Sequence, residues 1–328
     1  RSFVWAGDNN ADFSRDNGMP SVIIAGQTAA LSGIFLWGHD VGGYLGTATQ
    51  EVFLRWAAFG AFSPLMHQFS NSNLGPWDYG EEGLAVYRQY AQLHMQLFPY
   101  LKDCVRLAIT QGAPIMQAMV LAFQSDQAAA EYEYQYMLGG CFLVAPVWKA
   151  GFTTWEVYLP EGYVWVEFWT GESFEGGRAV QAEAPLEKIP VFVRQGCVVG
   201  LIPEDVQTLV AVKEGEADIK GLGAERVLQV WGVRELPGSH VDNDELDARL
   251  TYSGRNAILE VELREPLQLT VQVMHQSIEE FSVSGQDAPP GGAKCEKTQD
   301  YLGRHLTACA LPATRGHLLL QWTVPSPR

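Results

Sequence analysis

Apolar residues near the start of the chain follow the patterns of strands separated by a helix. One amphipathic segment has an apolar body, in which several alanines stand beside Val22, Ile23, Ile24 and Leu31. Asp16 and Asn17 are suitable helix caps, Pro20 suits a first turn, and Gly33 follows the last apolar residue. Residues 34–37 then form a brief apolar run bounded by glycine, which is typical of a buried parallel strand. The pattern predicts a strand, a loop, a helix and a second strand.

The alternation of helix and strand continues to about residue 114. Residues 49–62 have apolar side chains at helical spacing after Thr49, which is a suitable cap. Residues 64–69 are predicted as a strand and residues 70–79 as a polar loop. Residues 81–110 form a long helical segment that Pro99 should kink or break, because proline cannot donate the helical hydrogen bond.

Beyond Pro114 the apolar period changes from helical spacing to two. Short β-rich runs between Gly and Pro turns predict strands at residues 142–147, 156–159, 163–169, 189–193 and 197–201. Further strand candidates are residues 227–231, 267–273 and 317–323. The predicted fold class is therefore α/β in the first part of the chain and all-β in the rest.

Two carboxylates stand next to the predicted parallel strands. Asp8 lies in the stretch Trp-Ala-Gly-Asp-Asn-Asn at residues 5–10, and Asp40 in Trp-Gly-His-Asp-Val-Gly-Gly-Tyr at residues 37–44. Barrel enzymes hold their catalytic groups just beyond the carboxyl ends of such strands. The competing interpretation is an ordinary loop carboxylate that caps nearby backbone, which we expect for Asp12 and Asp16.

These two stretches, in this order and at this separation, resemble glycoside hydrolase family 31, the retaining α-glucosidase family. Residues 5–8 match its acid/base signature, and residues 39–44 match the His/Ala-Asp-hydrophobic-Gly-Gly-aromatic motif of its next barrel strand. The Trp-Ala-Gly-Asp form, followed by residues 12–14 and 17–18, is most similar to the bacterial branch that includes sulfoquinovosidases. Shorter matches continue at residues 55–56, 98–101, 143–147, 158–160, 170–172 and 190–194.

The resemblance implies the C-terminal part of a (β/α)8 TIM barrel followed by two β-sandwich-like domains. We expect the barrel part at residues 1–114, a proximal β-domain at 115–203 and a distal β-domain at 204–328. Family members have five earlier barrel strands, one of which holds the nucleophile, an Asp in a Trp-x-Asp-Met-Asn-like motif. The chain has no counterpart of that motif. We therefore expect a C-terminal portion of a larger enzyme that is inactive alone.

Cleavage of an acetal needs a proton for the leaving oxygen and stabilisation of charge at the anomeric carbon. Retaining enzymes use two carboxyl groups about 5–5.5 Å apart for this purpose. The resemblance gives the acid/base role to Asp8. Asp40 is either the second carboxylate or, as the family pattern implies and we prefer, a support for the loop and the pocket floor. In the second case the glycine pair after it allows close backbone approach.

Other residues are sugar-binding candidates by resemblance. Tyr44 stands at the position of an aromatic residue that walls the sugar subsite, and Trp5 is a further substrate-binding candidate. Arg1 matches a sugar-binding arginine, but it lies closer to Asp8 than usual. Either a segment is missing between Phe3 and Val4 or this match is accidental. We expect three more side chains in the pocket wall: Trp37, His39 and Trp77.

The predicted strand at residues 64–69 departs from the family pattern. The family usually has Arg-x-His at its end, and that His binds sugar hydroxyls. Here His67 stands at the Arg position and Phe69 at the His position. A phenyl ring cannot make the hydrogen bonds of an imidazole. We place Phe69 among the substrate-contacting residues and His67 in the wall, and we expect an altered substrate.

Composition limits the alternatives. The chain has 328 residues, of which 47% are hydrophobic and 18% are charged. This length and composition are typical of a folded protein of two or three domains. The net charge is −16 and the 22 Lys and Arg residues form no local cluster, which argues against nucleic acid as partner. No apolar run is long enough to cross a membrane.

The five cysteines form no close pair and leave an odd one, so we expect reduced thiols and a cytoplasmic rather than a secreted protein. Since the first residue is not Met, an export signal upstream stays an open alternative.

We predict hydrolysis of terminal α-glycosidic bonds by double displacement. The expected partner is a carbohydrate, an α-glucoside or a modified glucoside, with no cofactor and no metal. Neither a Gly-x-Ser-x-Gly nor a His-Glu-x-x-His motif is present. Alternatives within the class are a sulfoquinovosidase and an α-glucosyltransferase, in which a sugar acceptor replaces water. An alternative of another class is a catalytically inactive carbohydrate-binding or packing module.

Overall fold

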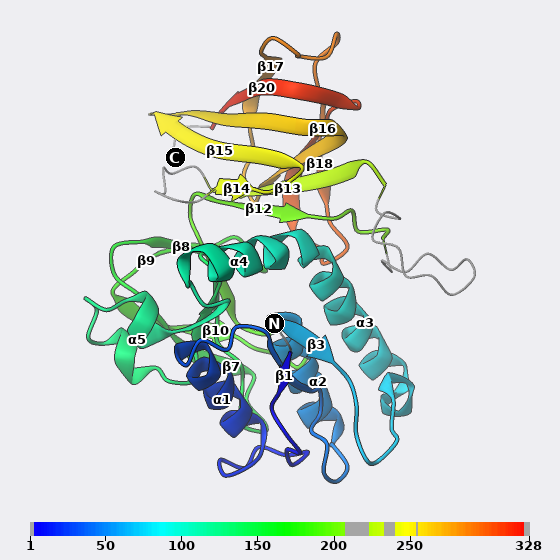
Figure 1. Ribbon diagram of the computed structural model, residues 1–328, viewed down its shortest axis with the longest axis vertical. Helices are drawn as coiled ribbons and strands as arrows, with labels where there is room; N and C mark the ends of the chain where they lie inside the picture. The colour runs from blue at the N-terminus through cyan, green and yellow to red at the C-terminus, as the bar shows by residue number, and fades with distance from the viewer. Residues whose placement is uncertain (1–2, 207–222, 233–239, 254, 325–328) are drawn as a thin grey trace. The chain divides into compact units, whose positions relative to one another are not determined.

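The computed structural model describes residues 3–206, 223–232, 240–253 and 255–324, and it consists of two compact units (Figure 1). The first unit contains Arg1–His94, Cys104–Phe168 and Phe174–Phe192. The second contains Met95–Asp103, Trp169–Ser173 and Val193–Arg328. Arg1, a substrate-binding candidate, lies outside the described residues.

The first unit begins with a small parallel sheet of alternating strands and helices. Strand β1 (Val4–Trp5) leads to helix α1 (Met19–Leu31), and β2 (Trp37–Asp40) leads to α2 (Gln50–Ala61) and β3 (Leu65–His67). The strands pair in parallel in the order β1-β2-β3. Parallel strands joined by helices are the repeating unit of the predicted barrel, and their carboxyl ends lie at one edge.

Local signals in this sheet were predicted with mixed success. Thr49 caps α2 as expected, because its side chain accepts a hydrogen bond from the Val52 amide. The cap of α1 is Gly18, so the prediction of Asp16 and Asn17 as caps is wrong, although Pro20 does lie in the first turn. The strand predicted at residues 34–37 instead begins at Trp37 and runs to Asp40.

Two helices follow β3 and a one-turn helix η1 (Pro76–Tyr79). Helix α3 spans Gly80–Gln96 and α4 spans Phe98–Gln111. The helices are separated at Leu97, so Pro99 is the second residue of α4; the predicted break near Pro99 is confirmed, because proline fits the first turn of a helix.

The rest of the first unit is β-rich. A six-stranded sheet has the order β4-β5-β6-β11-β8-β9, and β10 pairs with β7. The bounds are β4 Met116–Ala118, α5 Met119–Ala122, η2 Ala129–Glu131, β5 Tyr136–Leu138, β6 Phe142–Val144, β7 Thr154–Leu159, β8 Val164–Glu167, β9 Ser173–Glu175, β10 Arg178–Glu183 and β11 Val191–Arg194. Its core includes Leu143, Val157, Trp165 and Phe192, all of which are buried.

Arg55 connects this β-rich part to helix α2. Its side chain is 4% exposed, and its guanidinium donates hydrogen bonds to four backbone carbonyls: Phe152, Ala184, Pro185 and Lys188. Such carbonyls would be costly to leave unpaired in the interior. Arg55 is therefore a structural residue.

The second unit contains a mixed β-sheet, in which β13 and β16 pair in parallel and the other described pairs are antiparallel (Figure 1). Its strands are β12 Cys197–Leu201, β13 Glu225–Trp231, β14 His240–Asp242, β15 Leu246–Ser253, β16 Asn256–Met274, β17 Glu279–Ser284, β18 Lys294–Gln299, β19 His305–Ala310 and β20 Thr314–Thr323. The first half of β16 lies between β15 and β20, and the second half pairs with β13 and β19. The ladder shifts between Leu263 and Leu267, where Pro266 cannot donate a backbone hydrogen bond. One long strand thus pairs with β15 and β20 along its first half and with β13 and β19 along its second half.

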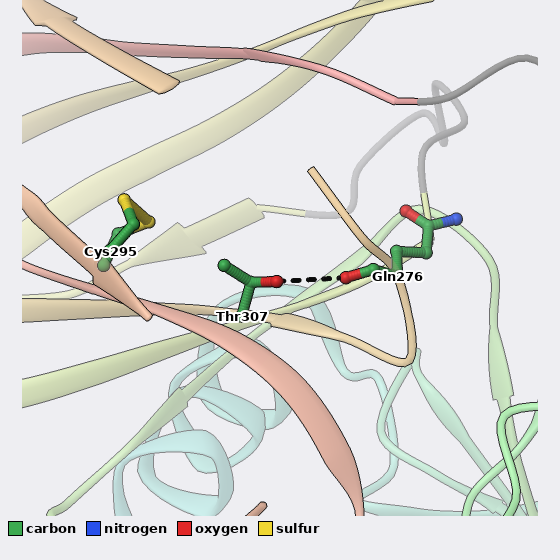
Figure 2. Close-up of a disulfide and its surroundings, with 4 residues drawn as sticks. Gln276, Cys295 and Thr307 are labelled. Carbon is green, nitrogen blue, oxygen red and sulfur yellow. Dashed lines mark hydrogen bonds between the residues drawn. A yellow bond between two sulfur atoms is a disulfide. The ribbon is translucent and has the colours of Figure 1, made fainter. Parts of the chain in front are cut away.

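The prediction of reduced cysteines is wrong for four of the five, because Cys141, Cys197, Cys295 and Cys309 are disulfide-bonded. Cys295 on β18 and Cys309 on β19 are direct partners in the antiparallel register and form a disulfide (Figure 2). Beside it, the Thr307 hydroxyl donates to the Gln276 carbonyl at 3.2 Å, which joins β19 to the turn after β16 (Figure 2). The two cysteines are 14 residues apart in sequence, so only the strand pairing brings them together.

Candidate active site

Asp8 lies in the loop that follows β1. Gly7 has a φ of +97°, a left-handed conformation that glycine adopts without strain, and the chain turns there. Asp8 itself is exposed. The Asn17 side chain donates to the Asp8 carbonyl at 2.9 Å, and the Asn9 side chain donates to Asn17 Oδ1 at 3.1 Å. The backbone of Asp8 is thus held by its own loop while its carboxyl group faces solvent.

The loop after β2 is bonded to the Asp8 loop. The amides of Tyr44 and Leu45 both donate to the Asn9 carbonyl at 2.8 Å, and the Ala11 amide donates back to the Leu45 carbonyl. A Cβ added at Gly43 would lie 2.7 Å from the Asn10 carbonyl oxygen, so only glycine allows this close approach. The two motifs that carried the family resemblance therefore meet in one backbone network.

Asp40 ends β2 and is 2% exposed. Trp5 Nε1 on β1 donates to Asp40 Oδ2 at 3.0 Å, and His67 Nδ1 on β3 lies 2.9 Å from Asp40 Oδ1. Burial raises the pKa of the Asp40 carboxyl, and the negative charge of Asp8 raises it further, whereas the bonds from Trp5 and His67 lower it. The Asp40 carboxyl group on β2 thus bonds to one side chain of each neighbouring strand, Trp5 on β1 and His67 on β3.

An aromatic surface surrounds this group. The rings of Trp5 and Tyr44 meet edge-to-face at 6.4 Å between centroids, and Tyr44 stacks on Phe69 at 5.6 Å. The His67 ring lies 6.0 Å from the Phe69 ring. Trp5 and Phe69 are 44% and 55% exposed, so an aromatic face is open to solvent next to Asp8 and Asp40.

Two predicted wall residues point the other way. Trp37 packs against Gly26 of α1, and His39 stacks on Phe59 of α2 at 4.5 Å. Alternation along β2 places both on the helix-facing side, opposite Asp40. Burial lowers the pKa of His39 to about 3, and Trp56 Nε1 donates to His39 Nδ1 at 2.9 Å, so His39 is neutral. These residues support the strand from its helix-facing side and are not part of the exposed aromatic surface beside Asp40.

Trp77 is 70% exposed in helix η1, and its ring lies over Gly75. Sequence reasoning missed Asn71. Its backbone N–H donates to the Tyr44 carbonyl at 3.0 Å, and its side-chain Oδ1 accepts from the Gly46 backbone N–H. The same reasoning missed that Trp5 and His67 share one carboxylate. Among the described residues, no group of three His, Cys, Asp or Glu side chains is placed to hold a metal ion.

Family models match most of the first unit. The description "Glycosyl hydrolases family 31 TIM-barrel domain" matches residues 1–103, and "Glycosyl hydrolase family 31 C-terminal domain" matches residues 112–199. The loops that hold Asp8 and Asp40 both fall within the first match.

Curated relatives agree with these models. The chain is 38% identical over 200 residues to a sulfoquinovosidase of Escherichia coli, which covers 59% of this chain and 29% of the relative. It is 33% identical over 208 residues to an alpha-xylosidase of Saccharolobus solfataricus, which covers 62% of this chain and 28% of the relative. The chain thus spans less than a third of the length of these relatives.

Solved structures share the fold over nearly the whole chain. A family 31 dextranase of Flavobacterium johnsoniae complexed with glucose gives a TM-score of 0.78 at 22% identity, over 98% of this chain and 44% of that one. The cycloalternan-forming enzyme of Listeria monocytogenes gives a TM-score of 0.79 at 23% identity, over 98% of this chain and 32% of that one. The signatures at Asp8 and Asp40, the barrel strands that hold them, and these matches agree. The chain belongs to glycoside hydrolase family 31.

Proposed function

We propose that these residues form part of a retaining α-glycosidase in which Asp8 is the acid and base. The supporting observation is the position of Asp8. It is exposed beyond the carboxyl end of a parallel barrel strand, in a loop whose backbone is bonded to the Asp40 loop. Catalytic groups of TIM-barrel enzymes lie at this face.

Asp8 would act twice in the reaction. In the first step its carboxyl proton goes to the glycosidic oxygen, the C–O bond breaks, and a carboxylate nucleophile bonds to the anomeric carbon. In the second step the Asp8 carboxylate takes a proton from water, and the water oxygen displaces the enzyme carboxylate. We expect the nucleophile on a barrel strand outside this chain, because no residue here matches the family nucleophile motif.

Asp40 is better suited to support the pocket than to attack the sugar. Both of its oxygens are engaged, one by Trp5 and the other by His67, and the carboxyl group is almost fully buried. A nucleophile needs an oxygen that is free to reach the anomeric carbon at about 3–3.5 Å. Asp40 instead fixes Trp5 and His67, and through them the aromatic surface with Tyr44 and Phe69.

The substrate is proposed from the departure at Phe69. A glucosidase of the family pattern offers an imidazole where this chain presents a half-exposed phenyl ring. His67 does not replace that imidazole freely, since its Nδ1 already bonds to Asp40. A glucose hydroxyl at Phe69 would lack a partner, which costs about 1–3 kcal/mol. We propose a modified glucoside as the preferred substrate. The relatives include two enzymes named for sugars other than plain glucose, a sulfoquinovosidase and an alpha-xylosidase.

A panel of aryl α-glycosides on the whole protein tests the activity and its specificity. Phe69→His should raise kcat/KM on plain α-glucosides by about 5–150-fold relative to its effect on the preferred sugar. Phe69→Leu is the matched control, because it removes the ring without adding a donor. Equal effects of both variants would contradict the specificity assignment.

Product analysis with and without an acceptor sugar separates hydrolysis from glucosyl transfer. A new disaccharide as main product would indicate the transferase alternative. No turnover of any aryl α-glycoside, with carbohydrate still bound, would indicate a catalytically inactive binding module and contradict the proposed function.

The proposed division of the chain is a barrel part at residues 1–114, a proximal β-domain at 115–203 and a distal β-domain at 204–328. The ranges of the two family models, 1–103 and 112–199, support the first boundary.

A cytoplasmic location was inferred from reduced cysteines, and the bond between Cys295 and Cys309 removes that support, because disulfides persist mainly in oxidising compartments. In the described part of the chain, none of the helices combines the length and apolarity needed to cross a bilayer.

A further inference from the structure

We propose that an aromatic cleft in the first unit binds a sugar ring of a neutral carbohydrate chain. The cleft has a volume of about 500 Å³ and is lined by five aromatic side chains: Tyr132, Tyr134, Trp148, Phe152 and Trp155. Arg15 also lines the cleft. This volume is within the range of ligand sites, about 300–1,000 Å³. The choice of ligand rests on the proposed glycosidase function.

Three rings of the aromatic cleft meet nearly at right angles, whereas Tyr134 lies tilted over Trp148 at 34° with centroids 4.3 Å apart. Trp148 and Trp155 meet at 84° with centroids 5.9 Å apart, and Phe152 and Trp155 meet at 85° and 5.4 Å. Perpendicular rings cannot cover each other's faces completely. Phe152 is 45% exposed and Trp155 is partly exposed, so apolar faces remain open to solvent. A pyranose ring has apolar C–H faces that can cover such surfaces.

The charges of the aromatic cleft favour a neutral ligand. Arg15 lies 5.0 Å from the Trp148 ring centroid and 5.6 Å from that of Tyr134, and Lys149 lies 4.4 Å from that of Trp148. These two cations already occupy the part of the cleft that would attract a quaternary ammonium group. Three carboxylates, Glu131, Glu133 and Glu156, also line the cleft and oppose an anionic ligand.

Polar side chains lie beside the aromatic rings. Thr154 and Glu156 on β7 and Gln181 on β10 line the cleft, and Gln181 is the direct partner of Glu156 in the strand register. All three are exposed. The Gln181 amide and the Thr154 hydroxyl can donate to or accept from the hydroxyls at the edge of a sugar ring, and the Glu156 carboxylate can accept from them. The cleft therefore offers apolar faces for C–H groups and polar atoms for hydroxyls.

The aromatic cleft shares a loop with the catalytic acid. Arg15 belongs to the loop between β1 and α1, which also holds Asp8, and Asn17 of this loop bonds to the Asp8 carbonyl. A carbohydrate held against Arg15 would contact this loop directly. A second contact on the same chain increases the effective concentration of a long substrate without changing the chemistry on a short one.

Affinity electrophoresis of the whole protein in gels containing dextran or soluble starch tests this site. We expect the migration of the wild-type protein to be retarded. Phe152→Ala should weaken binding by about 3–10-fold, because its exposed half is the apolar area that the sugar would cover. Gln181→Ala, at an exposed position on β10, should also weaken binding while leaving the fold intact. Hydrolysis of a small aryl α-glycoside should be unchanged in both variants.

Val120→Ala is the matched control, because Val120 is 53% exposed in the same unit but does not line the cleft. The proposal is overturned if neither polysaccharide retards the wild-type protein, or if the two cleft variants migrate as the wild type does. Activity measured in parallel separates the two proposals. Retardation that depends on Phe152 in a protein without glycosidase activity contradicts only the proposed function. Activity without such retardation contradicts only the cleft.

Discussion

Trp5→Phe removes one donor from a buried carboxylate and keeps the aromatic ring. Trp5 Nε1 donates to Asp40 Oδ2 at 3.0 Å, and Asp40 is 2% exposed. A hydrogen bond to a charged group contributes about 1.5–3 kcal/mol, and a buried acceptor left without a partner costs a similar amount. We therefore expect Trp5→Phe to lower the free energy of unfolding at neutral pH by about 1.5–3 kcal/mol.

The pH dependence of this loss follows from the Asp40 carboxyl. Because burial raises its pKa above the ordinary value of 3.8, the folded protein holds this proton more tightly than the unfolded chain does. Asp40 thus lowers stability as pH rises through its folded pKa, and the Trp5 bond offsets part of that loss by stabilising the ionised form. The cost of Trp5→Phe should be full above the folded pKa of Asp40 and should fall as the pH drops below it.

Urea unfolding followed by circular dichroism at neutral and acidic pH measures this difference on the whole protein. Trp77→Phe is the control, because Trp77 is 70% exposed and its loss should change stability by about 0.5 kcal/mol or less. A cost of Trp5→Phe that is equal at both pH values, or no greater than that of Trp77→Phe, would refute the assignment of Asp40 as a buried anchor.

Three further changes test other parts of the structure. Arg55→Met should lower the unfolding free energy of the first unit by about 3–5 kcal/mol in urea titrations, because four carbonyls lose their donor; a loss below 1 kcal/mol would contradict this. Cys295→Ser should lower that of the second unit by about 2–4 kcal/mol and reduce the effect of reductant on the melting temperature, whereas unchanged sensitivity to reductant would contradict the pairing. His67→Ala should reduce kcat/KM, and His67→Asn, which restores a donor to Asp40, should recover part of it; an equal loss in both variants would exclude a role through this bond.

The elements that local chemistry specifies could be predicted from the sequence. Helix α2 follows a cap at Thr49 and an apolar face at helical spacing, and β12 was predicted with its observed bounds. Strand β2 was misplaced, because Trp-Gly-His-Asp has no β-branched residue and its position depends on pairing with β1 and β3. Strand β18 is exposed along its whole length, so it has no apolar period to detect.

The candidate site shows the same division. Asp8 and Asp40 were identified from motifs, because each motif is contiguous in sequence. The bonds from Trp5 and His67 to Asp40 could not be predicted, since they depend on the register of three strands. The disulfide was missed for the same reason: Cys295 and Cys309 become neighbours only through the pairing of β18 with β19. The aromatic cleft likewise joins side chains from a barrel loop and from strands far along the chain.

Activity of the Asp8→Ala variant on aryl α-glycosides with different leaving groups tests the central claim most directly. In the whole protein, loss of the general acid should lower kcat/KM by about 10²–10⁴-fold on substrates with poor leaving groups, and by less on those with good ones. Azide should then accelerate turnover and yield an α-glycosyl azide, because a small anion can displace the enzyme carboxylate from the β-linked glycosyl-enzyme, with inversion, without a base. Asp16→Ala, at an exposed carboxylate of the same loop, should leave both behaviours unchanged. An equal loss on all leaving groups, with no effect of azide, would contradict the assignment of Asp8 as acid and base.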